Sequence, residues 1–144
     1  MTGELTTWGY ERRAIGDLSW VLHKHSIHIV VDVRLNATSR WEGFSGGSVR
    51  NMCRAVGVQY RHEPALGVPS ARRRRLRTEA DYAALWAWYR EHLTEPEVSA
   101  AIDRVVSDLR AGRNVCLLCR EADPRRCHRH LVAEEVERRL GKEV

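Results

Sequence analysis

Two short apolar runs constrain the fold of this chain more than any other feature of its sequence. They cover residues 27–33 and 114–119 and consist almost entirely of β-branched or aliphatic side chains. Continuous apolar runs of this length are typical of parallel strands that are covered on both faces of a sheet. Weaker strand patterns lie at residues 5–10 and 58–62. The sequence therefore predicts a small, mainly parallel sheet.

Helical patterns fill the intervals between these strands. Helices are expected at residues 15–25, at residues 48–56, from Thr78, from Thr94 to before Gly112, and from Asp123 to Leu140. Thr78 and Thr94 are each followed three residues later by an acidic residue, which is typical of a capping box. The alternation of strands and helices predicts an α/β fold, a three-layer α/β/α sandwich with residues 34–47 and 63–77 as loops.

Length and composition predict one domain over residues 1–144. Hydrophobic residues make up 43% and charged residues 30% of the 144 positions, which is the balance of an ordinary globular protein. No secretory signal is recognised at the start, and no apolar run is long enough to cross a bilayer, so we expect no membrane association. Four cysteines without an export signal are expected to be thiols, ligands or core residues in a reducing compartment. The expected location is the cytoplasm.

The densest group of reactive residues runs from Cys119, at the end of the last predicted strand, to His130. Cys127 is expected in the first turns of the last helix, where the helix dipole and unpaired amides favour a thiolate. His128 is a candidate acid or base, and Glu121 is a candidate to orient it or to move a proton. Cys119, Glu121, Cys127 and His128 are therefore the candidate catalytic residues. The competing interpretation of either thiol is a packed core residue, which we expect for the other two cysteines, Cys53 and Cys116.

Three chemistries fit this segment. The spacing of Cys119 and Arg125 resembles the anion loop of cysteine-dependent phosphatases, but the loop lacks glycine, and Glu121 and Asp123 would repel a phosphate. Cys119, Cys127 and His128 are candidate ligands for an open transition-metal site, for iron or for haem. The third possibility is a thiol and imidazole pair acting on a small anionic or nitrogen-heterocyclic substrate.

A second group of polar residues lies after the strand at residues 27–33. Asp32 and Arg34 form a pair that can present a fixed fork to a planar or anionic group, and Ser39, Arg40 and Trp41 follow on the next loop. The alternative interpretation is that the pair serves only to hold the loop. Because sites in open α/β sheets lie beyond the carboxyl ends of the strands, both groups are expected at one edge of the sheet.

The residues that carry chemistry resemble those of the domain of unknown function called DUF488. The resemblance rests on Trp8-Gly9-Tyr10-Glu11-Arg12, Asp32-Val33-Arg34, Ser39-Arg40, Phe44-Ser45, Gly57 with Tyr60, Leu66-Gly67, Cys119-x-Glu121 and Cys127-His128-Arg129. It covers residues 7–140 and implies a shared site that includes Asp32, Arg34 and Arg129, but it implies no reaction. Such domains continue after the last helix into a short strand, so a final edge strand near residues 142–144 is expected to be missing or vestigial.

Three functions are carried forward as hypotheses. The first is an enzyme that acts on a small anionic or heterocyclic substrate, with Asp32, Arg34, Arg40 and Arg129 binding it. The second is an oxidative enzyme that holds haem or iron at the cysteines and histidine. The third is a nucleic-acid or partner-binding module that uses the arginine-rich segments, which give the chain its net charge of +5. In that third hypothesis, Trp20, Trp86 and Trp88 are expected in the core rather than at a stacking surface.

Overall fold

The sheet of this protein contains four strands in the order β1-β4-β2-β3, all parallel. The computed structural model describes residues 1–40 and 43–141. The strands are β1 (Leu5–Gly9), β2 (Ile29–Asp32), β3 (Gln59–His62) and β4 (Val115–Cys119). Residues of β2 and β4 are buried throughout, whereas the edge strands are partly exposed. The apolar runs correctly predicted the two central strands.

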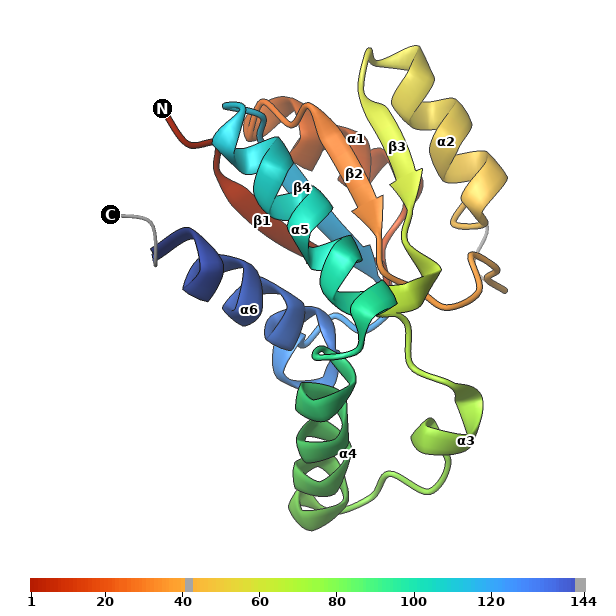
Figure 1. The fold of residues 1–144 in the computed structure, drawn as a ribbon. Helices are drawn as coiled ribbons and strands as arrows, with labels where there is room; N and C mark the ends of the chain where they lie inside the picture. Colours follow the sequence, from red (N-terminus) through yellow and green to blue (C-terminus); the bar gives the residue numbers. More distant parts are fainter. Residues whose placement is uncertain (41–42, 142–144) are drawn as a thin grey trace.

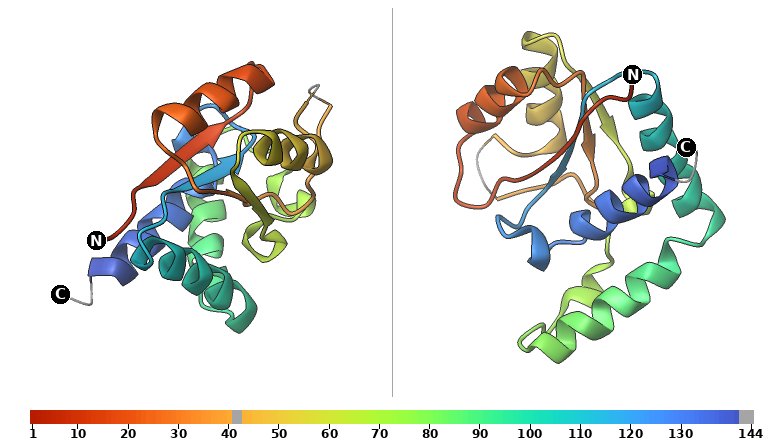
Figure 2. Two further views of the ribbon diagram at one scale, coloured as in Figure 1. Left: turned by 90° about the horizontal axis from the view of Figure 1, so that it is seen from above. Right: turned by 90° about the vertical axis from the view of Figure 1, so that its left-hand side faces the viewer.

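Helices cover both faces of the sheet, so the predicted α/β sandwich is confirmed (Figures 1 and 2). One face carries α1 (Ile15–Lys24) and α2 (Gly46–Ala55), whose side chains pack with Val30, Cys116 and Leu118. The other carries α5 (Pro96–Arg110) and α6 (Arg129–Gly141), together with part of α4 (Glu79–His92). Alternate residues of β4 therefore face two separate cores, because successive side chains in a strand point to opposite faces.

The beginnings of the helices test the two capping predictions. Thr78 caps α4 as expected, since its hydroxyl accepts a hydrogen bond from the amide of Asp81. The prediction for Thr94 was wrong, because its hydroxyl donates to the carbonyl of Glu91 at the end of α4. Glu95 instead precedes α5, and Pro96 occupies its first turn. The boundary moves by one residue and the helix itself is as predicted.

Segments beyond the carboxyl ends of the strands form the surroundings of the site. The 3₁₀ turn η1 (Pro64–Leu66) and the short helix α3 (Ser70–Arg73) lie within the predicted loop 63–77. Helix α4 extends below the sheet in Figure 1, and the Tyr89 hydroxyl on its inner side donates to the carbonyl of Leu66 at 2.5 Å. These segments lie along one side of the carboxyl edge of the sheet.

The expectations about the tryptophans and about the end of the chain have different outcomes. Trp20 on α1 is 60% exposed, so its expected place in the core was wrong, and the ammonium group of Lys24 lies over its ring. Trp86 and Trp88 are partly buried against the core. Trp41 and the terminal residues 142–144 lie outside the described residues. Among the helices of residues 1–40 and 43–141, none is long and apolar enough to span a membrane.

Candidate functional site

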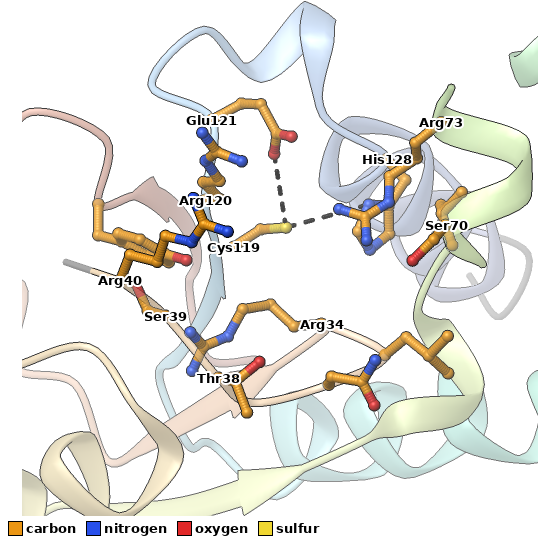
Figure 3. Close-up of a pocket in the computed structure, with 14 residues that line it drawn as sticks. Arg34, Thr38, Ser39, Arg40, Ser70, Arg73, Cys119, Arg120, Glu121 and His128 are labelled. Atoms are coloured by element: carbon orange, nitrogen blue, oxygen red, sulfur yellow. Dashed lines mark hydrogen bonds between the residues drawn. The ribbon is translucent and has the colours of Figure 1, made fainter. Parts of the chain in front are cut away.

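The carboxyl ends of three neighbouring strands meet at one edge of the sheet. Strand β4 ends at Cys119, β2 continues into Arg34, and β1 continues into Tyr10, whose amide donates to the Cys119 carbonyl at 3.1 Å. A pocket of about 800 Å³ lies at this edge, and Cys119, Arg34 and His128 are among its lining residues (Figure 3). The two groups of residues that the sequence singled out are therefore brought together.

The segment from Cys119 to α6 differs from the expected continuous helix. Asp123 and Pro124 begin only the short 3₁₀ turn η2 (Pro124–Arg126), in which the Asp123 carboxylate accepts from the amide of Arg125. Cys127 then has an extended backbone (φ −127°, ψ 139°), and α6 begins after His128. The prediction that Cys127 lies inside the helix was wrong. The break lets both Cys127 and His128 contact Cys119, just before the first turn of α6.

The two thiols share one imidazole nitrogen. His128 Nδ1 lies 4.0 Å from the Cys119 sulfur and 3.9 Å from the Cys127 sulfur. The other ring nitrogen, Nε2, lies 2.8 Å from the carbonyl of Val33, which can only accept a hydrogen bond. Nε2 therefore carries a proton, and Nδ1 is the atom that exchanges a proton with sulfur. Glu121 Oε2 lies 3.8 Å from the Cys119 sulfur.

Burial and mutual contact shift the pKa values of the two thiols in this cluster in opposite directions. A hydrogen bond to Cys127, and then burial, hold the pKa of Cys119 well above its usual value. Burial would also raise the pKa of Cys127, but the hydrogen bond from Cys119 and the charge of His128 outweigh it, and this pKa is well below its usual value. Burial would lower the pKa of His128, and the Cys127 thiolate more than offsets it. These shifts favour the thiolate form of Cys127 and the protonated forms of His128 and Cys119.

Glu121 adds a fourth titratable group at the mouth of the cluster. Burial first, and then the negative charge of Cys127, raise the pKa of this carboxyl group. A carboxyl group with a raised pKa holds its proton closer to neutral pH and is able to donate it to a reacting molecule.

Asp32 and Arg34 form a buried fork. The guanidinium of Arg34 donates to both carboxylate oxygens of Asp32, at 2.8 and 2.6 Å, and to the carbonyl of Phe44 at 2.7 Å. The hydroxyl of Tyr60 donates to Asp32 at 2.6 Å, and the Arg34 guanidinium lies over the ring of Tyr10. Arg34 lines the pocket, whereas Asp32 is fully buried behind it. The pair thus holds the loop after β2, and part of the Arg34 guanidinium faces the pocket.

Arg129 is placed differently from the other predicted binding residues. It is 2% exposed and lines neither hollow at this edge of the sheet. Its guanidinium donates to the carbonyls of Glu121 and Ala122. This geometry makes Arg129 a positioning residue, because it fixes the loop that carries Glu121.

The pocket combines cationic and hydroxyl groups around Cys119. In Figure 3, Arg40 and Arg120 lie on one side of the Cys119 sulfur and Arg73 and His128 on the other. Predicted site residues that line this pocket are Arg34, Arg40, Cys119, Glu121 and His128. Arg73, Arg120, Thr38 and Ser70 also line it and were not among the predicted site residues. The only available signal was the arginine run at residues 72–75, in which nothing local marks the residue that faces the site.

The cluster also has the donor set of an open transition-metal site. The ligand atoms of Cys119, Cys127 and His128 all lie within 4.8 Å of one another. Three ligands of the sulfur and nitrogen type with a fourth position left open are typical of catalytic zinc, and the Nε2 bond to Val33 orients the imidazole as an outer-shell partner does. By contrast, the sulfurs of Cys116 and Cys119 face different cores, so this C-x-x-C pair does not chelate.

Fold and site together define a small α/β domain with a thiol and imidazole centre at the carboxyl edge of a parallel sheet. The family model described as Domain of unknown function DUF488 matches residues 15–136. The chain belongs to this family, as its resemblance suggested. Comparison with curated proteins and with solved structures finds no match.

Proposed function

We propose that this protein is a thiol-dependent enzyme that acts on a small anionic substrate. The observation that carries the proposal is the position of His128 Nδ1, within 4.0 Å of two sulfurs, at a pocket that four arginines line. Arg34 is buried beside Asp32, and Arg40, Arg73 and Arg120 are exposed on the rim. A cationic rim around a thiolate favours a substrate with negative charge.

The proposed reaction is a two-step transfer to water. The Cys127 thiolate attacks an electrophilic atom of the substrate, and a sulfur–substrate bond forms as the bond to the leaving group breaks. The leaving group departs with the bonding electrons and takes the proton from Nδ1 of His128. Water then gives its hydroxyl to the substrate and its proton to His128, and the thiolate is restored. Glu121 lies where it is able to protonate or orient the departing group.

Alkylation with iodoacetate and iodoacetamide tests the proposal without a known substrate. The two reagents differ in charge, and the cationic pocket is expected to raise the rate of the anionic reagent relative to the neutral one at Cys119 or Cys127. Cys53 and Cys116 are internal controls, because both are fully buried in the core on the α1 and α2 side of the sheet, away from the pocket. Fragmentation mass spectrometry locates the modified sulfur.

Two variants sharpen this experiment. His128→Asn is expected to lower alkylation at the thiol pair at least tenfold, and Arg40→Ala to lower the rate of iodoacetate but not of iodoacetamide. If Cys119 and Cys127 react no faster than Cys53 and Cys116 in the folded protein, the proposal fails.

A metal-dependent enzyme is the second candidate function, favoured by the spacing of the three ligand atoms. Cys119, Cys127 and His128 would hold the ion, which would supply Lewis-acid or redox chemistry beside the arginine-lined pocket. The mostly polar lining fits a bare ion better than the apolar faces of haem. Titration with Zn²⁺ or Fe²⁺ is expected to give one ion per chain, lost in Cys127→Ser and kept in Cys53→Ser. Absence of stoichiometric binding would exclude it.

The proposed chemistry also bears on location and on the third hypothesis. A working thiolate needs a reducing environment, which supports a cytoplasmic location. Binding of nucleic acid to the arginine-rich segments stays a prediction, to be tested by the salt dependence of oligonucleotide binding.

A further inference from the structure

A second hollow adjoins the arginine-lined pocket on the side of α4. Its volume is about 300 Å³, and one of its walls is apolar, formed by Leu76 and by Tyr82, Leu85 and Trp86 of α4, whereas most of its other lining residues are charged. The rings of Tyr82 and Trp86 lie 6.0 Å apart at a tilted angle. A cavity of roughly 150 Å³ with apolar walls is enough to bind a benzene ring. The second hollow is therefore large enough for one aromatic ring, which would lie against this apolar wall.

The two hollows share the reactive centre. Five residues line both of them, namely Val68, Arg73, Arg120, Glu121 and His128. Cys119 lines only the first hollow and Cys127 only the second. The thiol pair therefore lies where the two hollows meet.

The two hollows differ in the groups that they offer to a ligand, and this difference determines which ligand can fill both. The first offers guanidinium and hydroxyl groups, such as those of Arg40, Thr38 and Ser70. The second also has charged residues, among them Glu11, but it adds the aromatic and aliphatic faces of its α4 wall. Its Arg126 is already engaged, with Glu79 at 2.5 Å and over the ring of Tyr82. A ligand that fills both must carry charge at one end and an apolar ring at the other.

We propose that the substrate class of this site is an aromatic anion, a ring that bears a carboxylate or phosphate group. The anionic group lies among the arginines, the ring lies against Tyr82 and Trp86, and the bond between them passes the thiol pair. This inference deepens the proposed function, because it places the substrate at the same centre.

Calorimetric titration of the intact protein with phenyl phosphate and with inorganic phosphate tests the inference. Both probes carry the same charged group, so the ratio of their affinities reports the ring alone. Burial of a phenyl ring is expected to make phenyl phosphate bind at least tenfold more tightly. Equal affinities would overturn the proposal.

Two matched variants assign that ratio to the second hollow. Trp86→Ala is expected to reduce the advantage of phenyl phosphate at least fivefold while the affinity for inorganic phosphate is unchanged. Trp88→Ala is the control on the same helix, since Trp88 stacks on His92 and lines neither hollow. If Trp86→Ala does not fold, Leu76→Ser serves in its place, with the same expected result. A ratio that neither variant changes would also overturn the proposal.

A variant of the first hollow separates this inference from the proposed function. Arg40→Ala is expected to weaken both probes by the same factor, because Arg40 lines only the first hollow. The charge preference of alkylation at the thiol pair, which is the ratio of the iodoacetate rate to the iodoacetamide rate, needs no ring and is expected to fall in Arg40→Ala whether or not the second hollow binds a ring. If the alkylation test fails but phenyl phosphate still binds more tightly than inorganic phosphate, the thiol chemistry is wrong and the aromatic-anion site remains. If the alkylation test succeeds but the two probes bind equally, only the aromatic subsite is wrong.

Discussion

Asp32 shows how one buried carboxylate organises several residues of the site. It accepts hydrogen bonds from Arg34 and from Tyr60, and it has no exposed surface. A buried ion pair stabilises a fold only when its remaining lone pairs are satisfied, and the Tyr60 hydroxyl does this for Asp32. Burial, and then the hydrogen bond to Asp32, raise the pKa of Tyr60, so the phenol keeps its proton at neutral pH.

Tyr60→Phe is expected to lower the free energy of unfolding by about 2 kcal/mol, because a charged acceptor in the interior loses a donor. Urea unfolding of the variant measures this loss. Tyr82→Phe is the control, since the described contacts of Tyr82 involve its ring, and a change within about 0.5 kcal/mol is expected there. Equal effects of the two substitutions would show that the bond to Asp32 contributes no stability.

At the scale of elements, the connection between β4 and α6 decides the site. Its ends could be predicted from the sequence, because Cys119 closes an apolar run and the last helix has clear apolar spacing. The break at Cys127 could not, since Asp123 and Pro124 have the same local appearance at the start of a long helix and of a single 3₁₀ turn. Tertiary contacts select the break, among them the bonds from Arg129 to the carbonyls of Glu121 and Ala122.

Gly9 is the residue of β1 that lets this connection lie close to the sheet. A Cβ atom at Gly9 would lie 1.7 Å from the carbonyl oxygen of Glu121, so Gly9→Ala must displace the loop. The expected cost is about 1–3 kcal/mol in urea unfolding, with slower alkylation of the Cys119 and Cys127 pair. Gly47→Ala is the matched control in α2, where a Cβ would meet no atom within 4 Å, and it is expected to leave both readouts unchanged. Normal alkylation in Gly9→Ala would contradict the role of this close approach.

Helix α6 carries an ion-pair network of Glu135 with Arg138 and Arg139, and Arg139 also pairs with Asp103 of α5. Bonds from Arg138 first, and then from Arg139, lower the pKa of Glu135 to about 2 from its ordinary value of 4.5. A depressed pKa means that this contribution is fully present above pH 4.5 and is lost as the pH falls towards 2. Glu135→Gln is expected to cost about 1 kcal/mol at neutral pH, because the pairs are partly exposed to solvent.

Urea unfolding at neutral pH and near the acid end of that range measures this pH dependence. The difference between wild type and Glu135→Gln is expected to shrink as the pH falls. Glu137→Gln, an exposed position on the same helix, is the control and is expected to show no such dependence. A difference that stays constant with pH would contradict the assignment to Glu135.

At the scale of the whole molecule, the layers follow from the sequence and the surroundings of the site do not. The run at residues 114–119 predicted a strand buried on both faces, and alternate residues of β4 do pack in two cores. The place of α4 beyond the strand ends depends on long-range contacts such as the bond from Tyr89 to Leu66, which no local pattern encodes. For this reason Trp86 was expected in the core, and neither Trp86 nor Tyr82 was recognised as a wall of a hollow.

The four cysteines report whether these layers unfold together. Burial raises the pKa of Cys53 to about 11 and that of Cys116 to about 12, and both are shielded within the core between the sheet and the helices α1 and α2. In a urea series, both are expected to become reactive towards iodoacetamide at the midpoint at which circular dichroism is lost, as in a single cooperative transition. Cys119 and Cys127 are expected to react already without urea. Earlier labelling of Cys53 alone would contradict this, because it would mean that α2 separates from the sheet before the rest of the fold is lost.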